Sequence, residues 1–170
     1  MNQLWAPWRS TYINVKPGHK KRCFLCEALN PACAGEPHAD RSANDRKNLL
    51  VKRGKKCMVM MNLFPYNAGH LLICPKAHKA NLEDLTPEET KELFELAIEM
   101  KRVLTKVLKP EGFNMGFNIG AVAGAGLVGH LHLHLVPRWG GDTNFMPVLS
   151  ETKVISQSLS QLYQRLQKVT

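Results

Sequence analysis

The run from His130 to Val136 alternates histidine with apolar residues, and no other segment of the 170-residue chain constrains the fold as strongly. Side chains on a β-strand point alternately to opposite faces, so this spacing predicts a strand with its histidines on one face and its leucines on the other. The leucine face is the natural core face, and Pro137 is expected to end the strand. Neighbouring histidines would lie about 6.6 Å apart, close enough to act on one ligand.

Unconnected histidines on a solvated surface would be the simpler interpretation of this face. That interpretation suits a lone histidine better than a row of them beside a glycine-rich loop. A sheet face that carries several imidazoles must be solvated, hydrogen-bonded or bound to a ligand. Neutral imidazole is both a nucleophile and a metal ligand near pH 7, so the run predicts a chemical site.

The glycine-rich stretch of residues 120–129 precedes the histidines and is expected to form a flexible loop. Glycines let backbone N–H groups come close to a phosphate, which makes the loop a candidate phosphate contact. A plain connector would have the same composition. No Walker A sequence is present in the chain, which disfavours an ATPase of that class.

Short apolar runs of strand length occur elsewhere between turn residues. Residues 57–61 and 70–74 flank a turn at 64–69, a spacing that predicts an antiparallel pair of strands. Residues 49–51 and 113–119 are two further expected strands. These runs together predict an antiparallel sheet.

A long helix is predicted after Thr86, which can cap its start. Pro87 suits the first helical position, and Glu89 completes a capping box. The apolar stripe that follows has helical spacing and ends at the Lys109-Pro110 pair. The stripe consists of Leu93, Leu96, Ala97, Met100, Val103, Leu104 and Val107. A final amphipathic helix is expected to use Val154, Ile155, Leu159, Leu162 and Leu166. We therefore expect an α+β fold, with an antiparallel sheet, one long helix packed on it and a C-terminal helix.

The remaining segments are expected to lack regular structure. Residues 1–22 are expected to be irregular, and residues 33–48 contain Gly, Pro, Asn, Asp and Ser and predict a surface loop. The first ten residues have no apolar core of the kind a secretory signal needs. No apolar stretch approaches the roughly 20 residues that span a bilayer. We expect a single domain over residues 1–170, located in the cytoplasm.

The chain has a formal net charge of +9, which a soluble basic surface would explain and which would also attract phosphates. A nucleic-acid surface would require a basic stripe with interleaved aromatic residues. The lysines and arginines are scattered instead, and aromatic residues make up only 7% of the chain. The charge therefore favours an anionic ligand, with nucleic acid a less favoured partner and no membrane partner.

The chain has five cysteines, and an odd number in a chain expected to be cytosolic disfavours a disulfide framework. Cys57 and Cys74 lie in apolar runs and are expected to be buried as small hydrophobic residues. Cys23 and Cys26 have the spacing of a zinc knuckle, but a lone pair of this kind is a weak signal. A redox pair or two buried thiols without metal remain alternatives, and a tetrahedral site would need two further ligands.

Four separated segments resemble the histidine-triad (HIT) family, whose motif alternates three histidines with apolar residues. The motif spans residues 130–136 here and is followed by Pro137 and Arg138. Residues 62–70 (Asn-Leu-Phe-Pro-Tyr-Asn-Ala-Gly-His) and 75–78 (Pro-Lys-Ala-His) match the family in order and type. Two outer segments, residues 4–9 and 136–145, resemble the branch that contains diadenosine tetraphosphate phosphorylases.

The resemblance implies a HIT-like fold and a two-step reaction on a nucleotide, with His132 as the nucleophile that attacks the α-phosphorus. A covalent nucleotidyl-histidine would form, and water or inorganic phosphate would then release the nucleotide. By the same resemblance His134 and His70 stabilise the phosphate or assist proton transfer. The substrates would be diadenosine polyphosphates such as diadenosine tetraphosphate, or related adenine nucleotides. The implied substrate-binding residues are Asn62, Asn118, Gly124, Ala125 and Gly126.

One position departs from the phosphorylase branch, because Gly126 stands where those proteins have a serine. Ala125 likewise replaces a glycine. The hydroxyl group that would help to hold an acceptor phosphate is therefore missing. Phosphorolysis is disfavoured by this change, and the histidine chemistry is unaffected.

The resemblance also supplies the two missing metal ligands, His78 and His130, beside Cys23 and Cys26. These four residues would form a closed Cys2His2 site with a structural zinc ion. Family members are commonly homodimers, so a homodimer is expected. His19 and His38 are expected at the surface, and Cys33 is expected to play no part in the site.

Two other classes of function compete with the enzyme. The first is a nucleotide sensor without turnover, against which His132 argues, because binding alone does not require a nucleophile. The second is an enzyme that removes adenylate from nucleic-acid ends, which the basic charge permits. The sequence shows no additional domain for binding DNA. An enzyme that acts on nucleic-acid ends should bind DNA with an affinity that depends steeply on the salt concentration.

Overall fold

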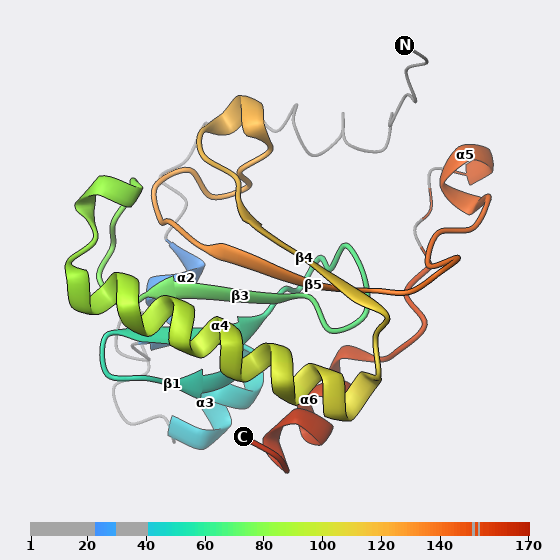
Figure 1. Cartoon of the computed structure of the whole chain (residues 1–170), viewed down its shortest axis with the longest axis horizontal. Coiled ribbons are helices and arrows are strands. Elements are labelled where there is room, and N and C mark those ends of the chain that lie inside the picture. The colour runs from blue at the N-terminus through green and yellow to red at the C-terminus, as the bar shows by residue number, and fades with distance from the viewer. Residues whose placement is uncertain (1–22, 30–40, 151, 153) are drawn as a thin grey trace.

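The protein is described by a computed structural model over residues 23–29, 41–150, 152 and 154–170. A five-stranded antiparallel sheet with the strand order β1-β2-β3-β5-β4 lies at its centre (Figure 1). The strands are β1 (Leu50–Arg53), β2 (Cys57–Met61), β3 (Leu71–Pro75), β4 (Gly112–Phe117) and β5 (Leu133–Arg138). The α-helices are α2 (Phe24–Leu29), α3 (Arg41–Lys47), α4 (Pro87–Leu108), α5 (Met146–Ser150) and α6 (Leu159–Gln167). The expected α+β class, the β2–β3 antiparallel pair and the long helix are confirmed.

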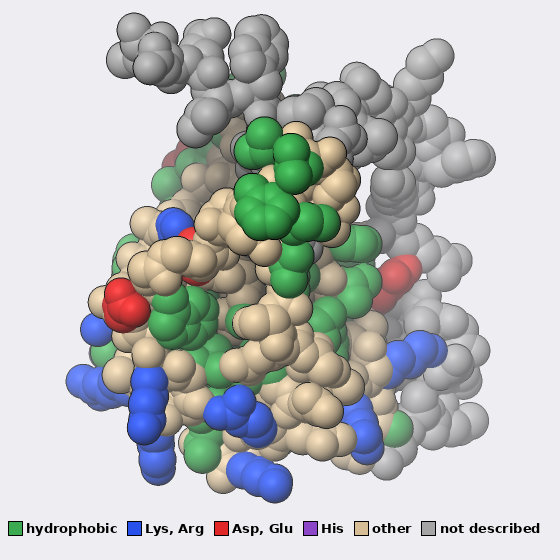
Figure 2. All heavy atoms as spheres, turned by 90° about the vertical axis from the view of Figure 1, so that its right-hand side faces the viewer, with side chains coloured by type: hydrophobic (Ala, Val, Ile, Leu, Met, Phe, Trp, Pro, Cys, Tyr) green, Lys and Arg blue, Asp and Glu red, His purple; other side chains and the backbone are tan. Residues whose placement is uncertain are grey.

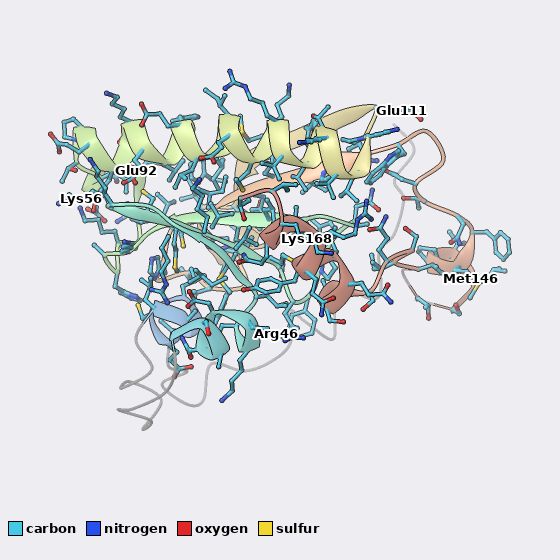
Figure 3. All side chains as sticks on the ribbon, turned by 90° about the horizontal axis from the view of Figure 1, so that it is seen from below. Arg46, Lys56, Glu92, Glu111, Met146 and Lys168 are labelled. Atoms are coloured by element: carbon cyan, nitrogen blue, oxygen red, sulfur yellow. The ribbon has the colours of Figure 1, made fainter. Side chains whose placement is uncertain are left out.

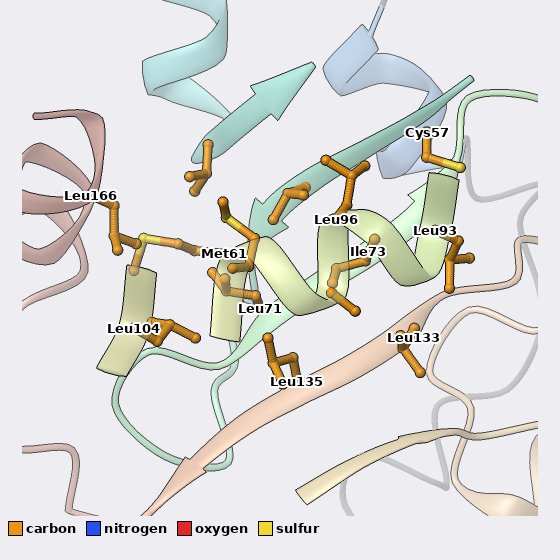
Figure 4. Close-up of a cluster of buried hydrophobic side chains, with 14 of the residues drawn as sticks. Cys57, Met61, Leu71, Ile73, Leu93, Leu96, Leu104, Leu133, Leu135 and Leu166 are labelled. Atoms are coloured by element: carbon orange, nitrogen blue, oxygen red, sulfur yellow. The ribbon is translucent and has the colours of Figure 1, made fainter. Parts of the chain in front are cut away.

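Helix α4 covers one face of the sheet, while α2 and α3 lie on the other side (Figure 3). Leucines of β3 and β5 are buried against α4 and, with α6, form the main core (Figure 4). Burying a leucine side chain stabilises a fold by about 1.5–3 kcal/mol, so this face holds the sheet and helix together. A smaller core lies between α2 and the other face; it contains Leu25, Ala28, Leu50, Met58, Met60, Leu72 and Cys74.

The start of α4 has the predicted capping box. The hydroxyl oxygen of Thr86 accepts a hydrogen bond from the Glu89 N–H at 3.2 Å, and the Glu89 carboxylate accepts one from the Thr86 N–H at 2.8 Å. The same carboxylate accepts a hydrogen bond from Nζ of Lys79 at 2.6 Å. The cap therefore also fixes the segment that follows β3.

Strand β5 differs from the prediction at both ends, since it begins at Leu133 rather than His130 and continues through Pro137. The preceding residues bind the segment after β3 instead: the Leu131 N–H donates to the Lys79 carbonyl at 2.6 Å. Pro137 fits into the strand because its missing N–H lies on the side where β3 has already ended, and the Pro137 carbonyl there accepts a hydrogen bond from Asn67.

The surface loop expected over residues 33–48 is wrong where α3 lies. The side chain of Asn44, which is buried, donates to the Ala28 carbonyl at 3.0 Å, and Asn48 donates to the Asn44 carbonyl at 2.9 Å. The bond from Asn44 to the distant Ala28 and the local bond from Asn48 together stabilise a short helix that has no hydrophobic periodicity. Helices α2 and α5 were likewise not predicted, because neither is long enough to show a helical repeat.

The C-terminal helix is confirmed but shorter than expected. It begins at Leu159, so Val154 and Ile155 lie in the segment before it. The predicted flexible loop contains a short 3-10 turn at Ala121–Ala123. Several predictions concern residues outside the described part of the chain, namely the segment of residues 1–22, which includes His19, and the residues Cys33 and His38. Among the described residues, none of the helices combines the length and apolar character needed to span a bilayer.

Candidate active site and metal cluster

Three buried imidazoles gather on the sheet face opposite α4. His134 pairs across the ladder with Leu72, so His70, just before β3, shares this face. The ring centroids of His70 and His134 are 5.1 Å apart, and those of His132 and His134 are 4.9 Å apart. The structure therefore brings together the three residues that the sequence assigned to catalysis.

Hydrogen bonds from the loop between β2 and β3 fix the proton position on His70. Its Nδ1 accepts hydrogen bonds from the Tyr66 backbone N–H at 3.1 Å and from the Asn62 amide at 3.3 Å. The proton of the neutral ring must then be on Nε2, which donates to Nδ1 of His134 at 2.9 Å. The Asn62 amide is itself oriented, since its oxygen accepts from the Phe64 N–H at 3.0 Å.

The same logic fixes the proton of His134. Because Nδ1 of His134 accepts the hydrogen bond from His70, its own proton is on Nε2. Burial, together with the neighbouring imidazoles, lowers the pKa of His134 to about 4 and that of His70 to about 3. Both rings are therefore neutral near pH 7. Within the described part of the chain, Nε2 of His134 is buried and has no hydrogen-bond partner.

An orphaned N–H of this kind is costly, because leaving a buried donor unsatisfied costs about 1–3 kcal/mol. An anionic oxygen bound beside His134 would satisfy it. The arrangement can therefore donate a hydrogen bond to a phosphate without carrying a positive charge itself.

At Nε2, His132 has a lone pair where His134 has a proton. Nδ1 of His132 is 2.8 Å from the His130 carbonyl oxygen, which can only accept, so Nδ1 carries the proton. Burial lowers the pKa of His132, which keeps the ring neutral and leaves a lone pair on Nε2. Among the described residues no hydrogen bond to this Nε2 is formed. A neutral imidazole with a free lone pair is a competent nucleophile.

The His130 ring lies in a separate cluster with two thiols and a second imidazole. Its Nε2 donates to the Pro75 carbonyl at 2.8 Å, which leaves a lone pair on Nδ1. That Nδ1 is 3.2 Å from Sγ of Cys23 and 3.5 Å from Sγ of Cys26, and the Cys26 Sγ is 3.3 Å from Nδ1 of His78. The four candidate ligand atoms all lie within 4.8 Å of one another.

This donor set fits a tetrahedral metal ion. Two thiols and two imidazoles are the ligands of structural zinc sites. A metal-bound histidine usually donates its other N–H to a carbonyl or carboxylate, as His130 does to Pro75. The sequence therefore named residues that the fold brings into one cluster.

The glycine-rich loop is attached to the site through Asn118. The Asn118 amide nitrogen donates to the Gly124 carbonyl at 3.5 Å and to the Tyr66 hydroxyl oxygen at 3.4 Å. Ala125 is half-buried, and Gly126 is exposed. Asn118 thus links Gly124 to Tyr66, whose backbone N–H orients His70.

Sequence reasoning missed the surroundings of the site beyond the histidines. The Tyr66 ring lies 4.7 Å from the His70 ring and 5.7 Å from the His134 ring, measured between centroids. An open cavity of about 250 Å³ follows on the same face, and another of about 300 Å³ shares Asn67 and Asp142 with it. Continuing the strand alternation past His134 to Val136 and Arg138 would have pointed to this region. The first cavity is lined by Tyr66, Asn67, Asn114, Val136, Arg138, Asp142 and Thr143.

Known proteins with the same features are found by sequence and by structure. Residues 44–141 match the sequence model of the HIT domain. The chain is 39% identical over 160 residues to the AP-4-A phosphorylase of Mycobacterium tuberculosis, covering 94% of this chain and 79% of that protein. It is 34% identical over 112 residues to the asymmetrical bis(5'-nucleosyl)-tetraphosphatase of Schizosaccharomyces pombe, covering 65% of this chain and 61% of that protein.

The fold is shared with solved structures as well. A Zn-bound histidine triad family protein from Mycobacterium smegmatis superposes with a TM-score of 0.61 at 22% identity, covering 86% of this chain and 91% of that one. At this identity the likeness concerns the fold alone. The expected HIT-like fold is confirmed.

Proposed function

The chain belongs to the HIT family, and from that premise we propose that it is a nucleotidyl hydrolase or transferase acting on diadenosine polyphosphates. The names of two relatives, AP-4-A phosphorylase and asymmetrical bis(5'-nucleosyl)-tetraphosphatase, support this substrate class. One observation carries the chemistry: the His130 carbonyl holds the proton of His132 on Nδ1, which leaves the Nε2 lone pair available. Diadenosine tetraphosphate is the proposed substrate.

In the first step the Nε2 lone pair of His132 attacks the α-phosphorus and forms a P–N bond. The bond from that phosphorus to the bridging oxygen breaks, and the leaving polyphosphate takes the electron pair. The imidazolium that results keeps its Nδ1–H on the His130 carbonyl, which stabilises the positive charge. The leaving group is stable as an anion near pH 7, so this step needs no proton donor.

In the second step an oxygen atom of water or of inorganic phosphate attacks the same phosphorus, and an attacking water releases one proton to the solvent. The P–N bond breaks and its electron pair returns to Nε2 of His132. Because Gly126 has no hydroxyl to hold an acceptor phosphate, water is the favoured acceptor. The products would then be AMP and ATP.

The other histidines would act on the phosphate and not on the leaving group. Nε2–H of His134 would donate to a non-bridging oxygen of the α-phosphate, and His70 would hold the His134 ring in that tautomer. Asn62 would contact the ribose with the donor capacity that its bond to His70 leaves. Further contacts to the phosphates would come from Asn118, Gly124, Ala125 and Gly126.

Zinc is the metal proposed for the cluster of Cys23, Cys26, His78 and His130. When bound, it would supply a closed structural link and no reacting ligand. Cys23 lies just before α2 and Cys26 in its first turn, whereas His130 lies just before β5, so the link would join distant parts of the chain. We further propose that the enzyme works as a cytoplasmic homodimer.

Product analysis tests the proposed function. The protein would be incubated with diadenosine tetraphosphate, with and without excess inorganic phosphate, and the nucleotides separated by chromatography. AMP and ATP under both conditions would support a hydrolase, and ADP and ATP only with phosphate would identify a phosphorylase. If folded, metal-loaded protein gives no nucleotide product under either condition, the proposal is wrong.

A further inference from the structure

The histidine face of the sheet continues beyond the reacting centre. On β5, Val136 and Arg138 follow His134 at every second residue and therefore share its face. On β4, Gly116 lies opposite His134, and Asn114 lies opposite Val136. Arg138 is two such steps from His134, which corresponds to about 13 Å along the strand.

The first part of this path has no side chain on β4. Gly116 is exposed, and a Cβ atom built there would meet no described atom within 4 Å. Glycine within a strand weakens the strand and often marks a site where a ligand approaches the backbone closely. The backbone at Gly116 thus forms an open floor beside the orphaned N–H of His134.

The second part of the path ends at the cavity of about 250 Å³ beside Tyr66. Arg138 forms one side of it and is held rigidly. Its guanidinium donates to both carboxylate oxygens of Asp142, at 2.6 and 3.0 Å, and to Oδ1 of Asn114 at 2.6 Å. Asp142 is fixed in turn by the Asn67 amide at 2.8 Å.

This bonding leaves Arg138 able to bind a further acceptor. A guanidinium has five N–H donors, and the three bonds to Asp142 and Asn114 use three of them. The remaining two have no acceptor among the described residues. A pre-oriented guanidinium binds phosphate or hydroxyl oxygens with little loss of side-chain entropy.

Basic and hydrophobic side chains gather in separate areas of the molecular surface on the side where β5 ends. Figure 2 shows it: Lys and Arg side chains gather along the lower part of the view, and hydrophobic side chains gather over α5 near the top. A positive field favours the approach of a polyanion. On the wall of the cavity, Tyr66 offers an aromatic ring that is 43% exposed.

We propose that Gly116, Asn114, Arg138 and Tyr66 form a subsite for the distal part of the leaving group. The polyphosphate chain would cross the floor at Gly116, and the second nucleoside would occupy the cavity between Tyr66 and Arg138. The inference rests on the proposed function and adds a substrate preference to it. Dinucleoside polyphosphates use the subsite, whereas adenylyl esters with a small leaving group do not reach it.

The test compares two substrates in the Gly116→Val variant. Diadenosine tetraphosphate has the long leaving group, and the p-nitrophenyl ester of AMP has a short one. A valine side chain would stand in the path, and kcat/KM for diadenosine tetraphosphate relative to that for the ester is expected to fall about tenfold or more. Met115→Val is the matched control, because Met115 is the adjacent residue of β4 on the opposite, α4-facing side.

A second variant covers the case in which valine at Gly116 disturbs the fold. Asn114→Ala removes one of the two residues that orient Arg138, and the same ratio should fall severalfold with the midpoint of thermal unfolding unchanged. Equal losses on both substrates, or no change in the ratio in either variant, would overturn the subsite while leaving the proposed function intact. If the unmodified protein cleaves neither substrate, the subsite and the proposed function both fail.

Discussion

His130 and His134 lie four residues apart, both are buried, and they present opposite chemistry to their surroundings. His130 donates from Nε2 to the Pro75 carbonyl and keeps a lone pair on Nδ1, beside two thiols. His134 accepts at Nδ1 from His70 and keeps a proton on Nε2. The first ring is set up to bind a cation, and the second to bind an anion.

The difference shows that the partner of the inner nitrogen decides what an imidazole can do. A carbonyl oxygen forces a proton onto that nitrogen and leaves the other nitrogen as a lone pair, as in His130 and His132. A donating imidazole has the reverse effect, as in His134. One run of alternating histidines therefore presents a lone pair beside two thiols at His130, a second lone pair at His132 and an N–H donor at His134.

The largest expected effect comes from replacing the proposed nucleophile His132, which lies between His130 and His134 in the sequence. His132→Ala should lower turnover of diadenosine tetraphosphate by roughly three orders of magnitude or more, because no covalent intermediate can form. Steady-state kinetics measures the loss, and an unchanged metal content shows that the cluster at His130 is intact. A loss of only about tenfold would be expected for a group that other residues can replace. If the variant keeps activity within this range of the unmodified protein, His132 is excluded as the nucleophile.

Replacing His134, the hydrogen-bond donor, should have the next largest effect. His134→Ala should reduce kcat by about 10²–10³-fold with a smaller change in KM, since one hydrogen bond to the developing charge is lost. His70→Ala should give a loss of similar size, because His70 sets the tautomer of His134. The double variant should then be no worse than the more damaging single one. Multiplicative losses would show that the two residues act independently.

Replacing a residue of the proposed metal site should reduce the stability of the protein more than its turnover. His78→Ala should lose the bound metal and lower the free energy of unfolding by on the order of 3 kcal/mol. Elemental analysis and chemical denaturation measure the two effects, and a chelator should lower the stability of the unmodified protein but not of the variant. Metal-free protein purified without chelator, with unchanged stability, would contradict the structural site.

The smallest and most gradual effect should come from pH. The folded pKa values of His70 and His134, about 3 and about 4, lie below the ordinary value of 6.5. Below pH 6.5 the unfolded chain therefore binds protons that the folded chain does not. The stabilisation is complete above pH 6.5 and is lost as the pH falls toward 4, at about 1.4 kcal/mol per pH unit for each proton.

Denaturation curves between pH 5 and pH 6.5 measure this slope, above the range in which most carboxylates titrate. His70→Gln is the control, because its amide cannot take up a proton. The slope should be shallower in this variant than in the unmodified protein. Identical slopes in the two proteins would show that His70 is not held neutral by the fold.

The α4 face could be predicted from the sequence almost completely, and the opposite face only in part. The helix from Pro87 has a capping box and a regular apolar stripe, and both are local signals. Helix α3 has neither, because its buried Asn44 depends on the carbonyl of Ala28, which no local pattern reveals. The start of β5 at Leu133 is not evident locally either, because the residues before it bond to the distant Lys79 carbonyl.

The candidate site was predicted as a set of residues but not as a set of tautomers. The histidine motif and its family resemblance named His70, His132 and His134. The proton positions depend on the Tyr66 N–H and the His130 carbonyl, which are backbone groups without a sequence signature. Arg138 and Asp142 lie next to the motif, but only the turn after β5 brings their side chains together.

The turn before His70 touches the far end of the long helix. Gly69 has a φ of +79°, and a Cβ atom there would lie 2.5 Å from Leu108 and 3.2 Å from Leu104. Glycine is needed both for this backbone conformation and for the close approach. The last turn of α4 therefore packs directly against Gly69, the residue that precedes His70.

A molecule whose helix end frays loses the packing that keeps His70 in line with His134. Amide hydrogen exchange in the last turn of α4 and thermal loss of turnover should then report the same local opening. A mutation at Leu104 or Leu108, on the opposite side of the sheet from the histidines, would slow the enzyme by raising the fraction of time that it spends open. Catalytic competence is in this sense a property of the helix end as much as of the histidines.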